Sequence, residues 1–116
     1  MILVLLDNLF FAAKINQAAA SSGITVKYVK KAEYALEEAR KEIPSLIIVD
    51  LDAADCSPLE LLFGLKSDEK LRSIPTLGFV SHINTGRQEQ AREAGCDRVL
   101  ARSTFDRDLT SILRVA

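Results

Sequence analysis

The amino-acid sequence predicts an α/β domain in which five parallel strands alternate with helices. Short apolar runs alternate five times with stretches whose apolar residues recur every three or four positions, the respective patterns of buried strands and amphipathic helices. The chain has 116 residues, of which 48% are hydrophobic and 27% are charged, and these values are typical of one globular domain. Strands and helices that alternate in this way form a parallel sheet with helices on both faces.

The first two strand–helix units occupy the beginning of the chain. Residues 2–6 form a continuous apolar run that predicts a strand covered on both faces, and an alanine-rich helix is expected at about 9–20, with Gly23 as its C-terminal cap. Residues 24–29 are β-branched and partly alternating, which favours an edge strand. A second helix is expected to end at Pro44, and its apolar positions are Ala32, Ala35, Leu36, Ala39 and Ile43.

The third unit begins with the apolar run 46–49, which leads directly into Asp50. Ser57 and Glu60 are predicted to form a capping box at the start of the next helix, with Pro58 in its first turn. The residues that follow at helical spacing in this helix are Leu59, Leu62, Phe63 and Lys66.

The last two units complete the predicted sheet. Residues 76–80 predict the fourth strand, and a second capping box of Thr85 and Gln88 is expected to begin a helix that ends before Gly95. Residues 98–101 predict a short fifth strand. One last helix is expected, and its apolar stripe is Phe105, Leu109, Ile112 and Leu113.

The apolar content of the strands predicts their order in the sheet. The first, third and fourth strands are fully apolar and should be central, whereas the mixed second and fifth strands should lie at the edges. This pattern favours the flavodoxin-like order 2-1-3-4-5 in a single (βα)5 domain.

Charge and cysteine content exclude several classes of protein. Fifteen basic and sixteen acidic residues give a net charge of −1, without the positive excess that nucleic-acid binding requires. Cys56 and Cys96 show neither a zinc-binding spacing nor a CxxC motif, and Cys56 is expected to be a plain buried or half-buried thiol. The apolar run 2–6 is too short for a signal peptide or a membrane span. We therefore expect a cytoplasmic protein with no nucleic-acid or membrane partner.

Charged side chains follow three of the predicted strands. Asp7 and Asp50 end the first and third strands, between which the predicted strand order reverses, and Arg102 ends the fifth. Ligands bind at such a switch point, and two neighbouring carboxylates repel each other unless a cation or basic group lies between them. A hard cation such as Mg²⁺ prefers oxygen ligands of this kind. His82, the only histidine, follows the fourth strand and is expected to be a surface-loop residue.

At these positions the sequence resembles the response regulator receiver domain (CheY-like) of two-component signalling, and the resemblance extends over residues 1–116. The segments that carry it are Ile2-Leu3-Val4-Leu5-Leu6-Asp7-Asn8, Leu46-Ile47-Ile48-Val49-Asp50-Leu51, Leu59-Glu60-Leu61-Leu62, Ile74-Pro75 and Ala94-Gly95-Cys96-Asp97. The resemblance implies that Asp50 is the phosphoacceptor. It also implies that Mg²⁺ would be held by Asp7, Asp50 and the backbone carbonyl of Asp52.

The chain departs from the family pattern at several active-site and switch positions. Leu6 replaces the first acid of the opening pair, which should weaken Mg²⁺ binding, and no other cofactor is expected. Val80 replaces the hydroxyl residue that ends the fourth strand, although Ser81 follows, and Val99 replaces the aromatic switch residue. Arg102 replaces the lysine that ends the fifth strand, and Ser103 replaces the next proline. Arginine is a rigid fork that can pair with Asp50 directly.

These departures favour an atypical or pseudo-receiver that works mainly by binding proteins, with weak or absent phosphorylation at Asp50. Two other interpretations remain open. One is a Mg²⁺-dependent receiver that is phosphorylated slowly, and the other is a small phosphatase that uses Asp50-Leu51-Asp52 as a DxD motif. In the first two cases the chain is not an enzyme beyond phosphorylation and dephosphorylation of its own Asp50.

The resemblance also implies a partner face on the fourth helix, fifth strand and fifth helix. The fourth helix has only Ala91 and Ala94 as apolar residues between Gly86 and Gly95, so it should be weakly anchored. A merely solvated helix is the alternative. The expected partners are a sensor histidine kinase, a downstream target or a second copy of the chain, and the residues expected on this face are Arg87, Gln88, Gln90 and Arg98.

Overall fold

Five parallel strands form one sheet in the order β2-β1-β3-β4-β5, as the sequence predicts. The computed structural model describes residues 1–81 and 83–116, and His82, the expected surface-loop residue, lies outside them. The strands are β1 (Ile2–Leu5), β2 (Val26–Val29), β3 (Leu46–Asp50), β4 (Thr76–Val80) and β5 (Arg98–Ala101). Among the described residues, no helix is long and apolar enough to cross a membrane.

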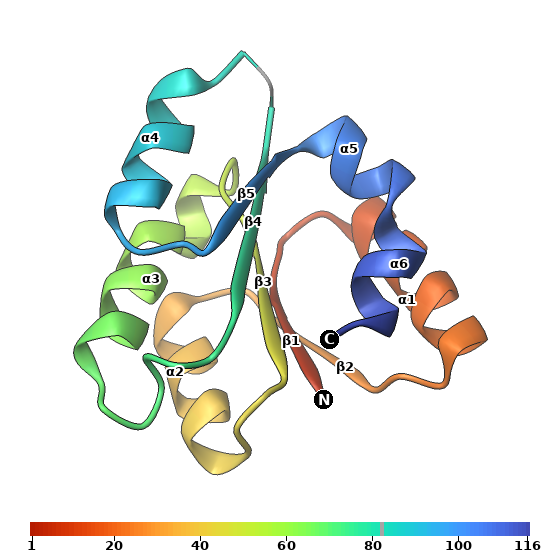
Figure 1. The fold of residues 1–116 in the computed structure, drawn as a ribbon, viewed down its shortest axis with the longest axis horizontal. Coiled ribbons are helices and arrows are strands. Elements are labelled where there is room, and N and C mark those ends of the chain that lie inside the picture. The colour runs from red at the N-terminus through yellow and green to blue at the C-terminus, as the bar shows by residue number, and fades with distance from the viewer. Residues whose placement is uncertain (82) are drawn as a thin grey trace.

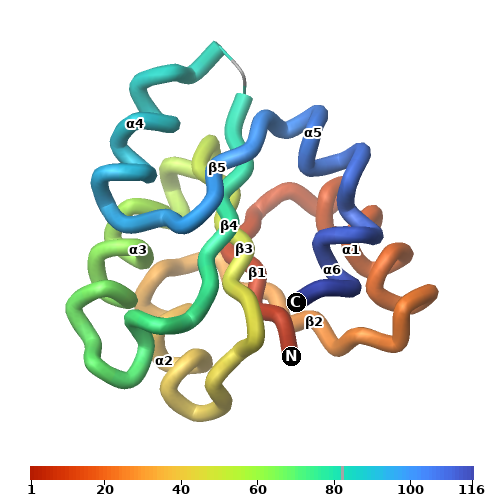
Figure 2. The backbone as a smooth tube through the Cα atoms, in the orientation of Figure 1, coloured from red at the N-terminus to blue at the C-terminus, as the bar shows by residue number. Residues whose placement is uncertain are grey.

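Helices cover both faces of the sheet (Figure 1). One side carries α1 (Leu9–Ser22), α5 (Arg102–Arg107) and α6 (Leu109–Arg114), and the other carries α2 (Ala32–Lys41), α3 (Pro58–Ser67) and α4 (Thr85–Glu93). A short 3-10 helix, η1 (Ala54–Cys56), follows β3. In the backbone trace of Figure 2, both chain termini lie far from α4.

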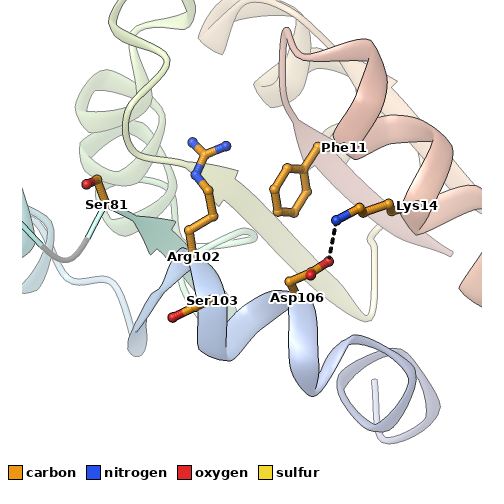
Figure 3. Close-up of a pocket in the computed structure, with 6 residues that line it drawn as sticks. All are labelled: Phe11, Lys14, Ser81, Arg102, Ser103 and Asp106. Carbon is orange, nitrogen blue, oxygen red and sulfur yellow. Dashed lines mark hydrogen bonds and ion pairs between the residues drawn. The ribbon is translucent and has the colours of Figure 1, made fainter.

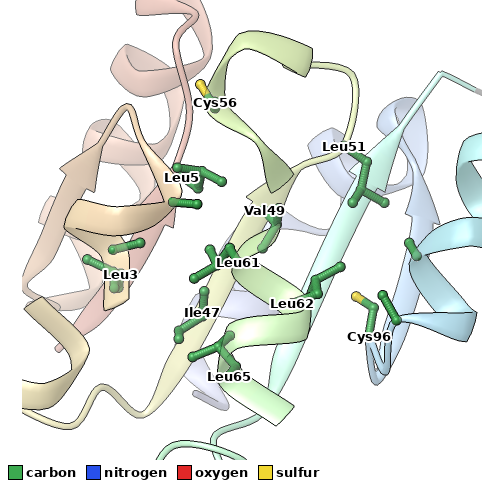
Figure 4. Close-up of a cluster of buried hydrophobic side chains, with 14 of the residues drawn as sticks. Leu3, Leu5, Ile47, Val49, Leu51, Cys56, Leu61, Leu62, Leu65 and Cys96 are labelled. Atoms are coloured by element: carbon green, nitrogen blue, oxygen red, sulfur yellow. The ribbon is translucent and has the colours of Figure 1, made fainter. Parts of the chain in front are cut away.

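The sheet separates two apolar cores. Alternate residues of each central strand point to opposite faces, so Leu3, Leu5, Ile47 and Val49 face α2, α3 and α4, where Leu61, Leu62 and Leu65 of α3 pack on them (Figure 4). Cys56 is a buried thiol in this core, as expected, and Cys96 is buried there as well.

The opposite core contains a stack of three aromatic rings. The ring centroids of Phe79 and Phe105 are 4.5 Å apart, and Phe11 lies 5.0 Å from Phe79 and 5.8 Å from Phe105. Ile2, Val4 and other apolar residues of the sheet belong to the same core. The three rings connect α1, β4 and α5 at the end of the sheet where the strands finish.

Two predicted capping boxes are wrong. Ser57 has a left-handed backbone (φ 57°). Its hydroxyl accepts no hydrogen bond from the backbone N–H groups of α3, a helix that the structure describes in full. The helix α4 begins one residue earlier than expected, because Asn84 is the cap and accepts from the backbone N–H of Arg87 at 3.2 Å, which makes Thr85 the first helical residue. Gly23 does cap α1 with φ 67°.

Three smaller expectations also fail. The single last helix is divided into α5 and α6 at Asp108, whose backbone leaves the helical region (φ −98°, ψ 9°). Ile43 lies beyond the end of α2 and is 53% exposed, so the buried face of α2 consists of alanines. In α3 the buried positions are Pro58, Leu61, Leu62 and Leu65, while Phe63 is 57% exposed.

Candidate functional site

The carboxyl ends of β1, β3 and β4 converge on one charged site. Asp50 is the last residue of β3 and is 4% exposed. It pairs across the sheet with Phe79 of β4, and Val49 before it pairs with Leu5 of β1. The strand order 2-1-3 therefore places the Asp50 side chain at the switch between β1 and β3, where such sheets hold their ligands.

Arg102 reaches this site from the first position of α5, directly after β5. Its Nη2 lies 3.4 Å from Oδ1 of Asp50 and 3.2 Å from Oδ2 of Asp52. The guanidinium carbon lies 5.1 Å from the ring centroid of Phe11 and 5.3 Å from that of Phe79. Cation–π attraction to these two rings and the two carboxylates together hold the Arg102 side chain over the site.

The Asp50 carboxylate is subject to opposing influences. Burial raises its pKa, and the neighbouring Asp52 charge acts in the same direction. The backbone N–H of Asp52, which donates to Asp50 Oδ1 at 3.0 Å, and the Arg102 charge lower the pKa without overcoming the effect of burial. The N–H of Asp52 and the Arg102 charge therefore offset only part of the cost of burying the ionised Asp50 carboxylate.

The Asp52 side chain contacts three other segments of the chain. Its Oδ2 accepts from the backbone N–H of Ser81 at 2.8 Å and also contacts Arg102. Its Oδ1 accepts from the side-chain amide of Asn84 at 3.4 Å. Asp52 therefore links the loop after β3 to the loop after β4 and to the start of α5.

Asp7 lies two residues after the end of β1 and is exposed. Burial first, and then the charges of Asp7 and Asp50, raise the pKa of the Cys56 thiol. A raised pKa keeps this thiol protonated, which disfavours both metal ligation and redox chemistry at Cys56.

The residues expected to hold Mg²⁺ fit a tightly bound ion poorly. Leu6 is buried in the apolar core instead of offering a carboxylate, and the Arg102 guanidinium already lies against Asp50. The backbone carbonyl of Asp52 accepts from the N–H of Ala54 at 3.0 Å. Among residues 1–81 and 83–116, no three acidic, cysteine or histidine side chains are grouped so that they could hold a metal ion.

A cleft of about 380 Å³ opens beside Arg102. Its lining is shown in Figure 3 and consists of Phe11, Lys14, Ser81, Arg102, Ser103 and Asp106. Lys14 of α1 and Asp106 of α5 form an ion pair at 3.1 Å across one side of this cleft. Arg102 lies between Ser81 and the Phe11 ring in this view.

Comparisons with known proteins agree with this topology, although no protein-family model matches the chain. The chain is 28% identical over 101 residues to the polar-differentiation response regulator DivK of Brucella ovis, an alignment that covers 87% of this chain and 82% of DivK. Its fold matches that of a response regulator from Hahella chejuensis with a TM-score of 0.85 at 20% identity, covering 97% of this chain and 90% of the other.

A third similar protein is the receiver domain of a sensor histidine kinase from Pseudomonas aeruginosa PAO1, whose crystal structure has a magnesium ion coordinated in the active site cleft. Its TM-score is 0.80 at 22% identity, and the match covers 98% of this chain and 93% of that domain. The chain is a homologue of DivK and has the CheY-like receiver fold.

The positions expected to form the switch contribute different groups in the structure. Val80 is fully buried in the core beneath α2, α3 and α4, and Val99 packs against the same core. Ser81 is half-buried and supplies its backbone N–H to Asp52. Ser103 is exposed at the cleft.

The expected partner face of the receiver is polar and only lightly attached. Arg87 and Gln88 are half-buried, Gln90 and Arg98 are exposed, and α4 rests on the sheet through a single buried residue of its own, Ala91. Ala94, just beyond the helix, is also buried.

Sequence reasoning missed two parts of the site. It assigned only the backbone carbonyl of Asp52, whereas the carboxylate makes the contacts described above. It also missed the support of Arg102 by Phe11 and Phe79. Asparagine is a preferred N-cap residue, and Asn84 stands directly before Thr85. This pattern could have predicted that Asn84 caps α4.

Proposed function

We propose that this chain is a receiver domain of two-component signalling that acts mainly by binding other proteins, with weak or absent phosphorylation at Asp50. The observation that carries this proposal is the position of the Arg102 guanidinium, 3.4 Å from Asp50 and 3.2 Å from Asp52. In this position the arginine supplies positive charge beside the carboxylate without any phosphoryl group.

The chemistry of phosphoryl transfer supports the same conclusion. Transfer requires a metal ion to neutralise charge on the oxygens that move. Leu6 removes one carboxylate that would attract the metal, so we expect any Mg²⁺ affinity to be low. A phosphoryl group arriving at Asp50 would also have to displace or reposition a guanidinium that two aromatic rings support.

The output of such a domain is expected to be protein binding on the face formed by α4, β5 and α5. Its exposed polar residues include Gln90 and Arg98. The proposed partners are a sensor histidine kinase or a downstream target, and a second copy of the chain is the alternative occupant. On this proposal the domain catalyses no reaction on another molecule.

A second candidate is a receiver that is phosphorylated slowly with Mg²⁺. It is favoured by the retention of two acids after neighbouring strands, since Asp7 is an exposed residue two positions after β1 and Asp50 is the buried last residue of β3. The two candidates differ in one measurable property, which is the extent of phosphorylation at Asp50.

Acetyl phosphate with Mg²⁺, followed by intact-protein mass spectrometry, tests the proposal. We expect little or no protein carrying one added phosphoryl group, and we expect Arg102→Lys to increase that fraction because lysine is a flexible point charge. Arg107→Lys is the matched control, since Arg107 is exposed and pairs with Asp108 at 3.0 Å. Stoichiometric modification of wild-type Asp50, lost in Asp50→Asn, would overturn the proposal.

A further inference from the structure

The outward face of α1 is much less charged than that of α2. Leu9 and Phe10, in the first turn of α1, are 79% and 86% exposed, and Lys14 is the only charged residue in this helix. The exposed residues of α2 are Glu33, Tyr34, Glu37, Arg40 and Lys41. Adjacent exposed leucine and phenylalanine side chains on a nearly uncharged helix face favour contact with another protein surface.

The outward residues of α1 form one uncharged stripe. The exposed residues that recur at intervals of three, four and three positions are Phe10, Ala13, Gln17 and Ala20. This spacing places them along one side of the helix, and it is the spacing of the seam between two packed helices. Leu9 lies beside Phe10 and widens the apolar end of the stripe.

The polar side chains on the two flanks of this stripe already have partners in their own chain. Lys14 forms an ion pair with Asp106 of α5 at 3.1 Å. On the other flank, the hydroxyl of Tyr28 in β2 donates to Oδ1 of Asn16 at 2.7 Å. Polar groups that are left imperfectly paired oppose association. Because these flanking groups are paired within one chain, a helix that covers the stripe leaves their partners in place.

The two ends of α1 are complementary in size and in charge. The side chains of Leu9 and Phe10 at the start are large, whereas those of Ala20 and Ser21 near the end are small. The first turn has no acidic residue and the last turn no basic one, so no charged side chain of α1 compensates its dipole at either end. A second α1 that runs antiparallel about the level of Ile15 brings Phe10 of one copy opposite Ala20 of the other. It also brings opposite dipole ends together.

We propose that α1 is a self-association face, on which a second copy of the chain packs its own α1 in the antiparallel direction. The contact residues are Leu9, Phe10, Ala13, Gln17 and Ala20. This inference goes beyond the proposed function, because α1 does not belong to the face formed by α4, β5 and α5 and no phosphoryl group is required. One helix face is smaller than a standard interface of about 1,600 Å², so the dimer is expected to be weak and reversible.

Sedimentation equilibrium between roughly 10 µM and 1 mM protein tests the proposal. The average mass of the wild type should rise with concentration from 12.8 kDa toward twice that value. Phe10→Glu should weaken association on the order of tenfold or more, because it places a charge in the contact. Phe63→Glu is the matched control, since Phe63 is 57% exposed on α3, and it should associate as the wild type does.

A mixing experiment tests the antiparallel arrangement. Ala20→Lys should also weaken self-association, because a long charged side chain would meet Phe10 of the other copy. In a mixture of Phe10→Glu and Ala20→Lys proteins, the introduced carboxylate and ammonium face each other at one end of the contact. The wild-type pair of Phe10 and Ala20 remains at the other end. The mixed pair should therefore associate more strongly than either variant does alone.

NMR amide signals of the wild type locate the face, and we expect their concentration-dependent shifts to fall on α1. A wild type that is monomeric at roughly 1 mM, or equal losses of association in Phe10→Glu and Phe63→Glu, would overturn the proposal. Absence of recovery in the mixture, or shifts confined to α4 and β5, would do the same. No phosphodonor is present, so the result is separate from the phosphorylation test of Asp50.

Discussion

At the scale of one residue, the Asp50 carboxyl balances the cost of burial against the hydrogen bond and the positive charge beside it. The carboxyl is almost completely buried at the end of β3, and the N–H of Asp52 and the guanidinium of Arg102 compensate its charge only in part. Burial disfavours the ionised form of a carboxyl group, and an amide of the same shape keeps an acceptor oxygen while it removes the charge. The energetic role of Asp50 can therefore be tested with an isosteric amide.

We predict that Asp50→Asn raises the melting temperature of the domain at pH 7 by a few degrees. Because burial raises the pKa of Asp50, the folded state holds the carboxyl proton more tightly than the unfolded chain does. The wild-type free energy of unfolding should therefore fall as the pH rises from the ordinary carboxyl pKa through the raised pKa, and it should then level off.

Thermal melts of both proteins across this pH range provide the measurement. The advantage of Asp50→Asn should shrink as the pH is lowered below the raised pKa, because the wild-type carboxyl is then protonated and neutral. An advantage that grows at low pH would contradict this account of Asp50.

At the scale of an element, α4 is connected to the site around Asp50 and Asp52 through its cap, Asn84. Its sequence buries only Ala91 within the helix, so packing contributes little to its stability. The Asn84 cap is correspondingly important, and the same carboxamide reaches Asp52 in the site. Elements of low local stability are the ones that move when a ligand binds.

We predict that Asn84→Ala destabilises α4 by about 1 kcal/mol, the usual cost of removing an N-terminal cap. Amide hydrogen exchange within α4 should accelerate, while exchange in β1 and β3 stays unchanged. Thr85→Ala is the control, because Thr85 occupies the first helical position and Asn84 is the cap. Equal acceleration by both substitutions would show that the Asn84 side chain has no special role.

The whole molecule is one sheet shared by two cores, so its parts are not independent. The sheet contributes Leu3, Leu5, Ile47 and Val49 to one face and Ile2, Val4, Ile48 and Phe79 to the other. Small domains built in this way usually unfold in one cooperative transition. A disturbance at the centre of the sheet should therefore lower the stability of both layers together.

Gly78 of β4 offers a test at this scale. A Cβ atom at this position would lie 2.6 Å from Cδ1 of Leu51 and 3.3 Å from the sulfur of Cys96. We predict that Gly78→Ala lowers the free energy of unfolding by about 1–3 kcal/mol, the usual cost of overpacking. Urea unfolding followed by circular dichroism and by NMR signals from each core should show coincident transitions. Gly86→Ala is the control, because its Cβ would meet open space.

The sequence by itself determined the strands, their order and the positions of the charged residues at the strand ends. Continuous apolar runs such as 46–49 require cover on both faces, and mixed runs such as 24–29 tolerate an edge, so composition separates the central strands from the edge strands. Asp50 and Arg102 were found in the same way, because parallel strands bring their carboxyl ends to one side.

Only the tertiary structure decided what these charged groups contact. Arg102 reaches Asp52 across 50 positions and Ser81 reaches it across 29, and no local periodicity encodes such separations. The caps were also decided by geometry, since Ser57 and Asn84 both have capping chemistry but only Asn84 has a side chain within reach of its helix. Strands can be predicted because burial imposes a local pattern of apolar residues on the sequence. Side-chain partners cannot be predicted in this way, because they depend on how distant segments pack together.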